Sequence, residues 1–239
     1  MNGIIYPYGS SHLIDTKSKK IYLPNKIDTA DFASLDNEIP ASTILQLSGG
    51  IDSAYVLWDW LKNNPDKYCL VHHIVLINRE NRHEKEIEAV DKILRWLDSI
   101  GLNNYFFIQN TFDYGNMTEL IYDVEVCGFL AGVLLRANRW KNIDNILLTQ
   151  YDRNTPREMS RRQILRSTTG RNINFVYKLT SMTKQQVIET MPEELFDLCW
   201  YCRTPHNNRK CGNCMTCKAV ERARKSTVDD AYKNFLKGM

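Results

Sequence analysis

Short apolar runs alternate with longer segments of helical periodicity through the middle of the chain. The runs have strand length and are rich in β-branched and aromatic residues. They are Thr43–Leu47, Cys69–Ile77, Tyr105–Ile108, Ile146–Thr149 and, as a possible fifth, Asn174–Tyr177. Between them, the segment 82–100 repeats apolar residues at helical spacing and ends at Gly101, and a further helix is expected through 130–135. This alternation predicts an α/β fold in which helices cover both faces of a parallel sheet.

Residues 1–40 do not follow this pattern. Two short apolar pieces, Ile4–Tyr6 and Ile21–Leu23, stand among Gly, Ser, Asn and Pro residues. We expect this part of the chain to form a hairpin arm that packs on the main domain.

The composition is that of an ordinary globular protein. Of the 239 residues, 43% are hydrophobic and 25% are charged, and the formal net charge of +3 is too small to predict nucleic-acid binding by itself. No apolar run reaches membrane-spanning length, since the longest, Val124–Leu135, contains Glu125. Because no basic-then-apolar leader follows Met1, we expect a cytoplasmic protein without a membrane partner.

The strongest candidate for a binding site is a hexapeptide between the first predicted strand and a helix that begins at once. Its residues are Ser48, Gly49, Gly50, Ile51, Asp52 and Ser53. Backbone amides and the positive end of the helix converge there, and the glycines let an anion approach closely. The two serine hydroxyls can donate to phosphate oxygens. The hexapeptide is therefore predicted to bind a nucleotide.

Asp52 is the unexpected member of this hexapeptide. A carboxylate repels phosphate unless a divalent cation lies between them, so we predict that Asp52 holds Mg²⁺. The alternative is an ordinary Gly-Gly turn in which Asp52 caps the helix.

Five of the seven cysteines lie near the C-terminus, which indicates a metal site in a reducing compartment more than disulfides. Two Cys-x-x-Cys steps share one residue, and the predicted ligands are Cys202, Cys211, Cys214 and Cys217. Four thiolates are the ligand set of a closed structural Zn²⁺ site. The same thiolates suit an iron–sulfur cluster, and Cys199 or His206 are spare donors that can replace one of the four.

The hexapeptide resembles the PP-loop of the ATP pyrophosphatase superfamily. It lacks the Gly-Lys-Ser/Thr ending of a Walker A loop and the three-glycine dinucleotide fingerprint. Together with the cysteine motif, it resembles the 7-cyano-7-deazaguanine synthase family over about residues 43–225. The segment Trp200–Cys202 is similar to that family's Trp-Ser-Cys at the first zinc ligand, which is why we choose Cys202 over Cys199.

The segment Met182–Ile188 is similar to the same family's Ser/Thr-Lys helix start. Thr183 and Gln186 give a capping-box pattern, which places Lys184 in the first helical turn. A cation is poorly placed there unless an anion is bound. We predict that Lys184 contacts ATP phosphates, and the alternative is a solvated surface lysine.

The resemblance implies an adenine nucleotide α-hydrolase-like fold and a carbon–nitrogen ligase of queuosine biosynthesis. It implies ATP, Mg²⁺ and Zn²⁺ as cofactors, and Asp52 and Lys184 as catalytic residues. By this analogy, AMP is passed to the carboxylate of 7-carboxy-7-deazaguanine, and ammonia then displaces the AMP. The same analogy implies a homodimer. The expected parts are the arm over 1–40, an ATP-binding α/β domain over 41–190 and a zinc-binding helical region over 191–239.

Two segments depart from that family. Its Pro-x-Arg-Asn segment corresponds to Glu125–Gly128 here, and its Asp-Tyr-Ser-Gly-Tyr-Pro-Asp-type segment is replaced by Gln150–Arg157. The acceptor can therefore be another base, a nucleotide or a protein carboxylate, activated by a diverged relative. Tyr151 and Asp152 are weak candidates for its pocket because they follow the fourth predicted strand.

The replacing segment opens a run rich in arginine. Its members are Arg153, Arg157, Arg161, Arg162, Arg166 and Arg171. The spacing at 153, 157 and 161 predicts one helix face. This face can bind a phosphate-bearing substrate or RNA, or it can be a solvated face or an oligomer contact.

Two rival hypotheses remain open. A PP-loop tRNA-modifying enzyme such as a thiolase would need a catalytic cysteine near the ATP site, for which Cys127 is the candidate. A non-enzymatic nucleic-acid or protein-binding module would use the cysteine motif and the arginines and would not need the hexapeptide.

Overall fold

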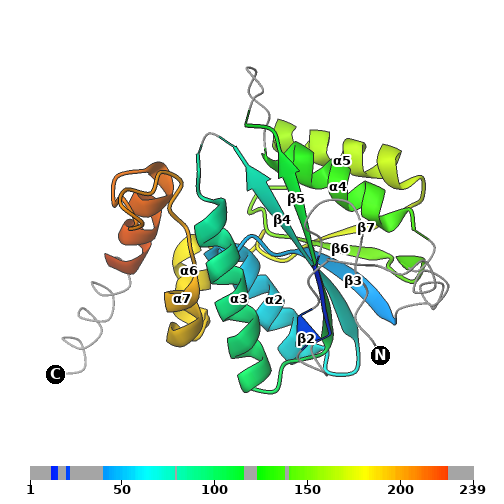
Figure 1. Cartoon of the computed structure of the whole chain (residues 1–239), viewed down its shortest axis with the longest axis horizontal. Coiled ribbons are helices and arrows are strands. Elements are labelled where there is room, and N and C mark those ends of the chain that lie inside the picture. The colour runs from blue at the N-terminus through cyan, green and yellow to red at the C-terminus, as the bar shows by residue number, and fades with distance from the viewer. Residues whose placement is uncertain are drawn as a thin grey trace.

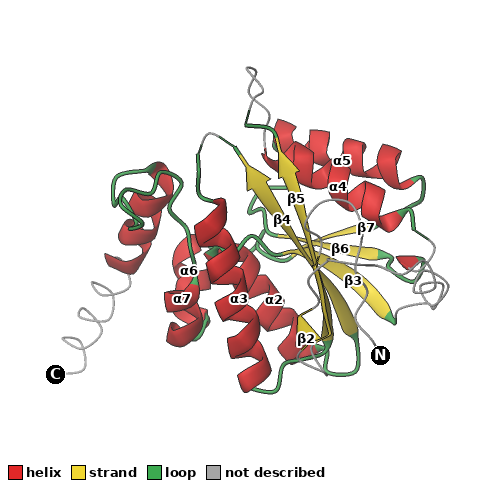
Figure 2. Ribbon diagram, in the orientation of Figure 1, coloured by secondary structure: helices red, strands yellow, loops and turns green. Residues whose placement is uncertain are grey.

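The computed structural model describes residues 12–15, 20–21, 40–78, 80–115, 123–137 and 140–225. Its centre is a sheet with the strand order β2-β1-β5-β4-β3-β6-β7 (Figures 1 and 2). Five neighbouring strands are parallel: β5 (Tyr105–Asp113), β4 (Tyr68–Ile77), β3 (Ala41–Gln46), β6 (Asn145–Leu148) and β7 (Asn174–Tyr177). The predicted α/β class is confirmed.

Strand β5 is longer than the sequence predicts because it pairs with β4 over its whole length. The sequence predicts this strand to end at Ile108, but β5 continues to Asp113 because β4 pairs with it as far as Ile77. Residues 109–113 are mostly polar, so their pattern does not mark a strand.

Helices cover both faces of the sheet, as Figure 1 shows. One face carries α2 (Ile51–Asn63), α3 (His83–Ser99), α6 (Lys184–Thr190) and α7 (Glu193–Leu198). The other carries α4 (Asp123–Leu135) and α5 (Pro156–Thr169). Strand alternation creates the two cores: Leu45 packs toward α2 and α3, whereas its neighbour Ile44 packs toward α4 and α5.

The two helices of the second face pack unusually closely. A Cβ at Gly132 would lie 1.7 Å from the Thr168 hydroxyl, and one at Gly128 would lie 2.8 Å from Cγ of Arg161. These glycines therefore let α5 approach α4, and Gly128 gives the stem of Arg161 its place.

The arginines do not line one helix face as the sequence predicted. Helix α5 begins at Pro156, behind an N-cap in which Thr155 accepts from the Glu158 amide, so Arg153 precedes the helix. Proline at the first helical position and a Thr cap fix this start.

The N-terminal part contributes β1 (His12–Asp15) and β2 (Lys20–Ile21), which pair antiparallel with each other, and β1 pairs antiparallel with β5. The piece Ile4–Tyr6 lies outside the described residues. Among the described residues, no helix is long and apolar enough to cross a membrane.

Candidate nucleotide site and metal centre

The loop between β3 and α2 brings main-chain amides to the carboxyl edge of the sheet. Gly49 has a φ of +76°, and a Cβ there would lie 3.0 Å from the carbonyl oxygen of Glu86, so both its angle and the approach of α3 require glycine. Gly50 is the N-cap of α2, and Asp52 therefore lies in the first turn and does not cap the helix. The first amides of α2 have no partner within the helix, and the helix dipole is positive there. This arrangement suits a bound phosphate.

The two serines of the loop have different surroundings. Ser53 is buried, and its hydroxyl donates to the Gly50 carbonyl (3.1 Å) and accepts from the Ser48 amide (3.2 Å). Ser48 is exposed, and its hydroxyl lies 3.0 Å from that of Ser53. Ser53 thus holds the loop in shape, whereas Ser48 is accessible to a ligand.

The carboxylate of Asp52 joins three distant segments. Its Oδ1 accepts hydrogen bonds from Nζ of Lys184 (2.7 Å) and from the hydroxyl of Tyr151 (2.6 Å). The predicted capping box places the lysine: Thr183 accepts from the Gln186 amide, and the Gln186 side chain accepts from the Thr183 amide. Oδ2 of Asp52 has no hydrogen bond or ion pair with any described residue, so it is available to a cation.

A cavity of about 220 Å³ opens beside the loop, between the carboxyl edge of the sheet and the helices α4 and α5. We call it the side pocket, and its polar lining includes Ser48, His72, Arg82, Glu86, Arg161 and Arg203. The rest of the wall combines apolar residues of β4, β6 and α4 with Asp123 and with polar side chains at the end of β3 and after β6. Ser48 thus belongs to the loop and to the side pocket at once.

Ion pairs build the outer wall of the side pocket. Arg82 pairs with Glu80 (2.7 Å), Glu86 (3.1 Å) and Asp123. Arg203 pairs with Glu80 (2.8 Å) and Asp123 (3.4 Å). Burial raises the pKa of Glu86 to about 7, even though Arg82 opposes this shift. The net charge of this wall therefore changes near neutral pH.

The inner wall holds buried polar groups with unused hydrogen-bonding capacity. Arg161 is 5% exposed; its Nη2 pairs with Glu158 (2.7 Å) and donates to Gln150 (2.6 Å), while its Nε has no partner among the described residues. His72 is fully buried and meets Asn110 through Nε2 (2.9 Å), but its Nδ1 has no such partner. Because burial lowers the pKa of His72 to about 4, its ring is neutral at pH 7. A buried polar atom without a protein partner can be satisfied by water, an ion or a polar ligand.

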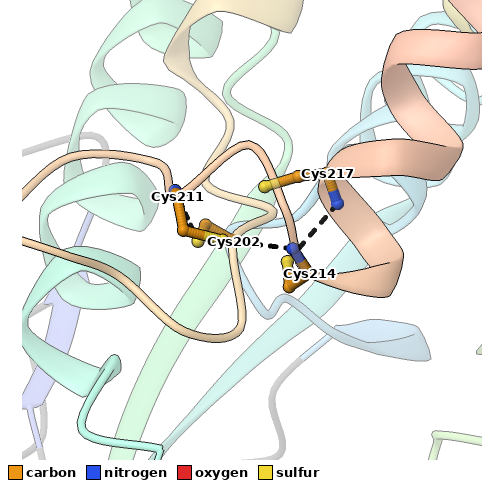
Figure 3. A group of neighbouring side chains, drawn as sticks. All are labelled: Cys202, Cys211, Cys214 and Cys217. Atoms are coloured by element: carbon orange, nitrogen blue, oxygen red, sulfur yellow. Dashed lines mark hydrogen bonds between the residues drawn. The ribbon is translucent and has the colours of Figure 1, made fainter.

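The four predicted cysteines converge in the C-terminal region. The sulfurs of Cys202, Cys211, Cys214 and Cys217 lie within 4.8 Å of one another (Figure 3). The first comes from the segment after α7, and the others come from a turn and from the start of the helical segment 215–225. Cys199 is not in this group, because its thiol donates to the Leu195 carbonyl (3.2 Å). This four-cysteine cluster suits a metal ion or an iron–sulfur cluster.

Main-chain amides favour thiolates in the cluster. The Cys211 amide donates to Sγ of Cys202 (3.2 Å), and the Cys214 amide donates to Sγ of Cys211 (3.2 Å). A hydrogen bond from the Thr204 hydroxyl and the neighbouring amides lower the pKa of Cys211 to about 6. Burial raises the pKa values of Cys202 and Cys217, so within the cluster only Cys211 and Cys214 are shifted toward the thiolate form.

The cysteine region is attached to both the loop and the side pocket. The Trp200 amide, two residues before the first cluster cysteine, donates to the Gly49 carbonyl (2.8 Å). Arg203, directly after that cysteine, reaches the side pocket through Glu80 and Asp123. Residues on both sides of Cys202 thus contact the loop and line the side pocket.

Comparison of the sequence with protein-family models and with curated proteins found no match in either set. Among solved structures, the chain is similar to a U34-tRNA thiolase NcsA from Methanococcus maripaludis with its [4Fe-4S] cluster. The similarity has a TM-score of 0.41 and 12% sequence identity, and it covers 92% of this chain and 77% of that chain.

The structure places all the residues that the sequence singled out for nucleotide and metal binding in two groups. The loop lies with Lys184, and the four cysteines lie together. Sequence reasoning missed the ionic wall of the side pocket, with Arg82, Glu86 and Arg203, because no motif marks residues that meet only in the fold. Cys127 lines the side pocket, but burial raises the pKa of its thiol to about 12.

Proposed function

We propose that the protein is a PP-loop enzyme that uses ATP to activate an acceptor held in the side pocket. The observation that supports this most is the sharing of Ser48 between a loop suited to phosphate and a cavity whose lining carries several charged side chains. A nucleotide on the loop and an acceptor in the cavity would be neighbours, as transfer between them requires.

The proposed reaction is adenylation of a carboxylate. An acceptor oxygen attacks the α-phosphorus of ATP, the α–β anhydride bond breaks, and pyrophosphate leaves. Ammonia then attacks the acyl carbon and loses a proton, and AMP leaves to give an amide. A second activation of the amide oxygen, with loss of AMP and of protons from nitrogen, gives a nitrile. The chain's part is to position the reactants and to neutralise charge with the loop amides and Lys184.

Two metal ions complete the proposal. Mg²⁺ at the free Oδ2 of Asp52 would supply positive charge to the phosphates. Zn²⁺ in the four-cysteine cluster would hold the fold, since a tetrahedron with Zn–S distances of about 2.3 Å separates its sulfurs by about 3.8 Å. The observed limit of 4.8 Å suits a single ion. A cubic four-iron cluster binds each cysteine at a different corner, which needs more separation.

The acceptor is proposed to be a small acid. The cavity of about 220 Å³ admits a single heterocycle or a chain end, and Arg82, Arg161 and Arg203 line it with guanidinium groups. A deazaguanine-like carboxylate, with ammonia as the second substrate, is the first acceptor to test. The segment Glu125–Gly128, of which Cys127 lines the cavity, has neither the arginine nor the asparagine of the resembling family, so a diverged acceptor of the same chemical class is the alternative.

Turnover of ATP tests the proposal. Purified protein would be mixed with ATP, Mg²⁺, ammonia and 7-carboxy-7-deazaguanine, and pyrophosphate release would be followed with mass spectrometry of the products. We expect AMP, pyrophosphate and the amide or nitrile, and we expect Asp52→Asn and Lys184→Met to remove them. Lys178→Met is the matched control, because that lysine pairs with Asp59 away from the loop. Consumption of another acid in its place would establish the diverged acceptor, and intact ATP with every acid would refute the proposal.

A thiolase-type activity is the second candidate, and Cys127 tests it. Its thiol lines the side pocket, but the raised pKa leaves it protonated at neutral pH, which disfavours a nucleophilic role. We expect Cys127→Ser to retain ATP turnover. Loss of all turnover in a folded Cys127→Ser protein would favour the thiolase.

A further inference from the structure

Five arginines in and beside α5 fall into two sets with different surroundings. Arg161 is buried against Glu158, and Arg171 donates to the carbonyls of Trp140 and Lys141 (both 2.6 Å). These two arginines hold the protein's own structure. Arg153, Arg162 and Arg166 have no carboxylate partner in the described part of the chain.

The second set lines a groove between α5 and β7, the strand at the edge of the sheet. Two adjoining hollows of about 580 and 490 Å³ share Arg162 and Arg166. We call their union the arginine groove, defined by Arg153, Arg162, Arg166, Phe175 and Tyr177. No acidic residue lines either hollow.

Aromatic rings lie directly under the guanidinium groups of this groove. The Arg166 guanidinium carbon is 5.0 Å from the centre of the Phe175 ring, and that of Arg162 is 5.9 Å from the Tyr177 ring. Arg162 also donates to the main-chain carbonyl of Arg153 (3.1 Å). A guanidinium that rests on a ring is held in place and still presents N–H donors outward.

Two carboxylates lie beside the groove. Asp152 is exposed, precedes Arg153 in the chain and accepts from the Asn154 amide (2.8 Å), so it offsets part of the charge of Arg153 and leaves that of Arg162 and Arg166. Glu158 accepts from the Tyr177 hydroxyl (2.7 Å), but it is 1% exposed and already pairs with Arg161. The groove is therefore a basic surface with ring platforms and no competing carboxylate in its lining.

We propose that the arginine groove binds a single-stranded nucleic acid, with phosphates on Arg153, Arg162 and Arg166 and a base stacked against the Arg166–Phe175 or the Arg162–Tyr177 pair. Single strands are recognised by this combination of a basic channel and stacking rings. A rigid double helix does not present its base faces, so it cannot use the rings. An acidic protein segment could use the charges but would gain nothing from stacking.

The groove opens at the same edge of the sheet as the nucleotide loop. Tyr151, which donates to Asp52 of the loop, lies two positions before Arg153 in the chain. Strands β3, β6 and β7 are parallel, so their carboxyl ends meet along this edge. A strand in the groove would lie near the loop, but its binding is separate from ATP turnover.

Fluorescence anisotropy without nucleotide tests the inference. The probes are labelled 12-nucleotide RNA and DNA single strands of mixed sequence, with a duplex and poly-glutamate as competitors. We expect single strands to bind and Arg162→Gln/Arg166→Gln to weaken binding at least tenfold. For this double variant, the slope of log affinity against log salt concentration should be shallower by roughly 1.4, because each of the two lost phosphate contacts accounts for about 0.7. The matched control, Arg95→Gln/Arg222→Gln, removes the same charge from exposed positions elsewhere.

A ring variant separates stacking from charge alone. Phe175→Leu keeps an apolar side chain beside the core and should weaken single-strand binding about tenfold. Thermal melts would show that each variant is folded. The inference is overturned if the groove and control variants bind equally, or if Phe175→Leu binds as the wild type does. It is also overturned if poly-glutamate or the duplex competes as well as the single strand. The difference between the RNA and DNA arms then identifies the sugar that the groove accepts.

Discussion

The nucleotide loop and the side pocket share Ser48, yet different forces hold them. The loop is fixed mainly by uncharged hydrogen bonds, such as Trp200 to Gly49 and Ser53 to Gly50, and by the close approach of α3. The side pocket is fixed by ion pairs, with three carboxylates around Arg82 and a buried pair at Arg161.

This difference has a chemical consequence. Neutral main-chain contacts depend little on pH or salt, whereas buried ion pairs fail when one partner is lost or changes protonation. Perturbations of the charges around Arg82 and Arg161 should therefore affect the side pocket and spare the loop, whose ion pair between Asp52 and Lys184 is separate from them. Loss of a single contact of the loop should do the reverse.

The largest expected effect comes from breaking the buried pair in the side pocket. Arg161→Met leaves Glu158, which is 1% exposed, without its cation. We expect a loss of about 3–5 kcal/mol in the free energy of unfolding. Urea unfolding of the purified proteins measures it.

A double variant shows whether the charge is the cause. Glu158→Gln added to Arg161→Met removes the stranded charge but can still accept from the Tyr177 hydroxyl. We expect it to recover most of the loss. Equal instability of the single and double variants would mean that packing against Gly128, and not the ion pair, supplies the stability.

A smaller, pH-dependent effect is expected at Glu86. Its folded-state pKa, about 7, lies above the ordinary value of 4.5, so between these values the folded protein keeps a proton that the unfolded chain has released. Stability should therefore fall as pH rises from about 4.5 to 7, by on the order of 3 kcal/mol, and the effect should level off above that range. Unfolding at several pH values measures it.

Glu86→Gln is the control for this pH dependence. The variant cannot ionise at this position, so its stability should lack this fall between pH 4.5 and 7. If the wild type and Glu86→Gln have parallel profiles, the carboxylate does not titrate in this window.

The two regions also differ in what sequence reasoning could find. The loop is made of six consecutive residues, and the capping box that places Lys184 lies within four, so both are visible as local patterns. The cysteine cluster is also visible locally, since three of its four ligands lie within seven consecutive residues as two Cys-x-x-Cys steps. These features follow from local geometry, which the chain order encodes directly.

The side pocket is not local in this sense. Arg82 comes from the start of α3, Arg161 from α5 and Arg203 from the cysteine region, and each looks like a surface residue in its own segment. The capping pattern of Thr155, Pro156 and Glu158 predicts the observed start of α5, whereas the arginine spacing predicts an earlier one. Which arginines become buried depends on the close approach of α4, which no pattern in α5 reveals.

The smallest effect should come from a single hydrogen bond of the loop. Tyr151→Phe removes only the hydrogen bond to Oδ1 of Asp52, so we expect about 1.5 kcal/mol of lost interaction and a roughly tenfold weaker affinity for ATP. Calorimetric titration with ATP and Mg²⁺ measures it. Tyr177→Phe is matched in chemistry, because it removes a hydroxyl that donates to Glu158 away from the loop, and it should bind ATP as the wild type does. If both variants weaken ATP binding equally, the loss is general and Tyr151 does not orient Asp52. If only Tyr151→Phe does, the loop depends on this contact although no ion pair of the side pocket has changed.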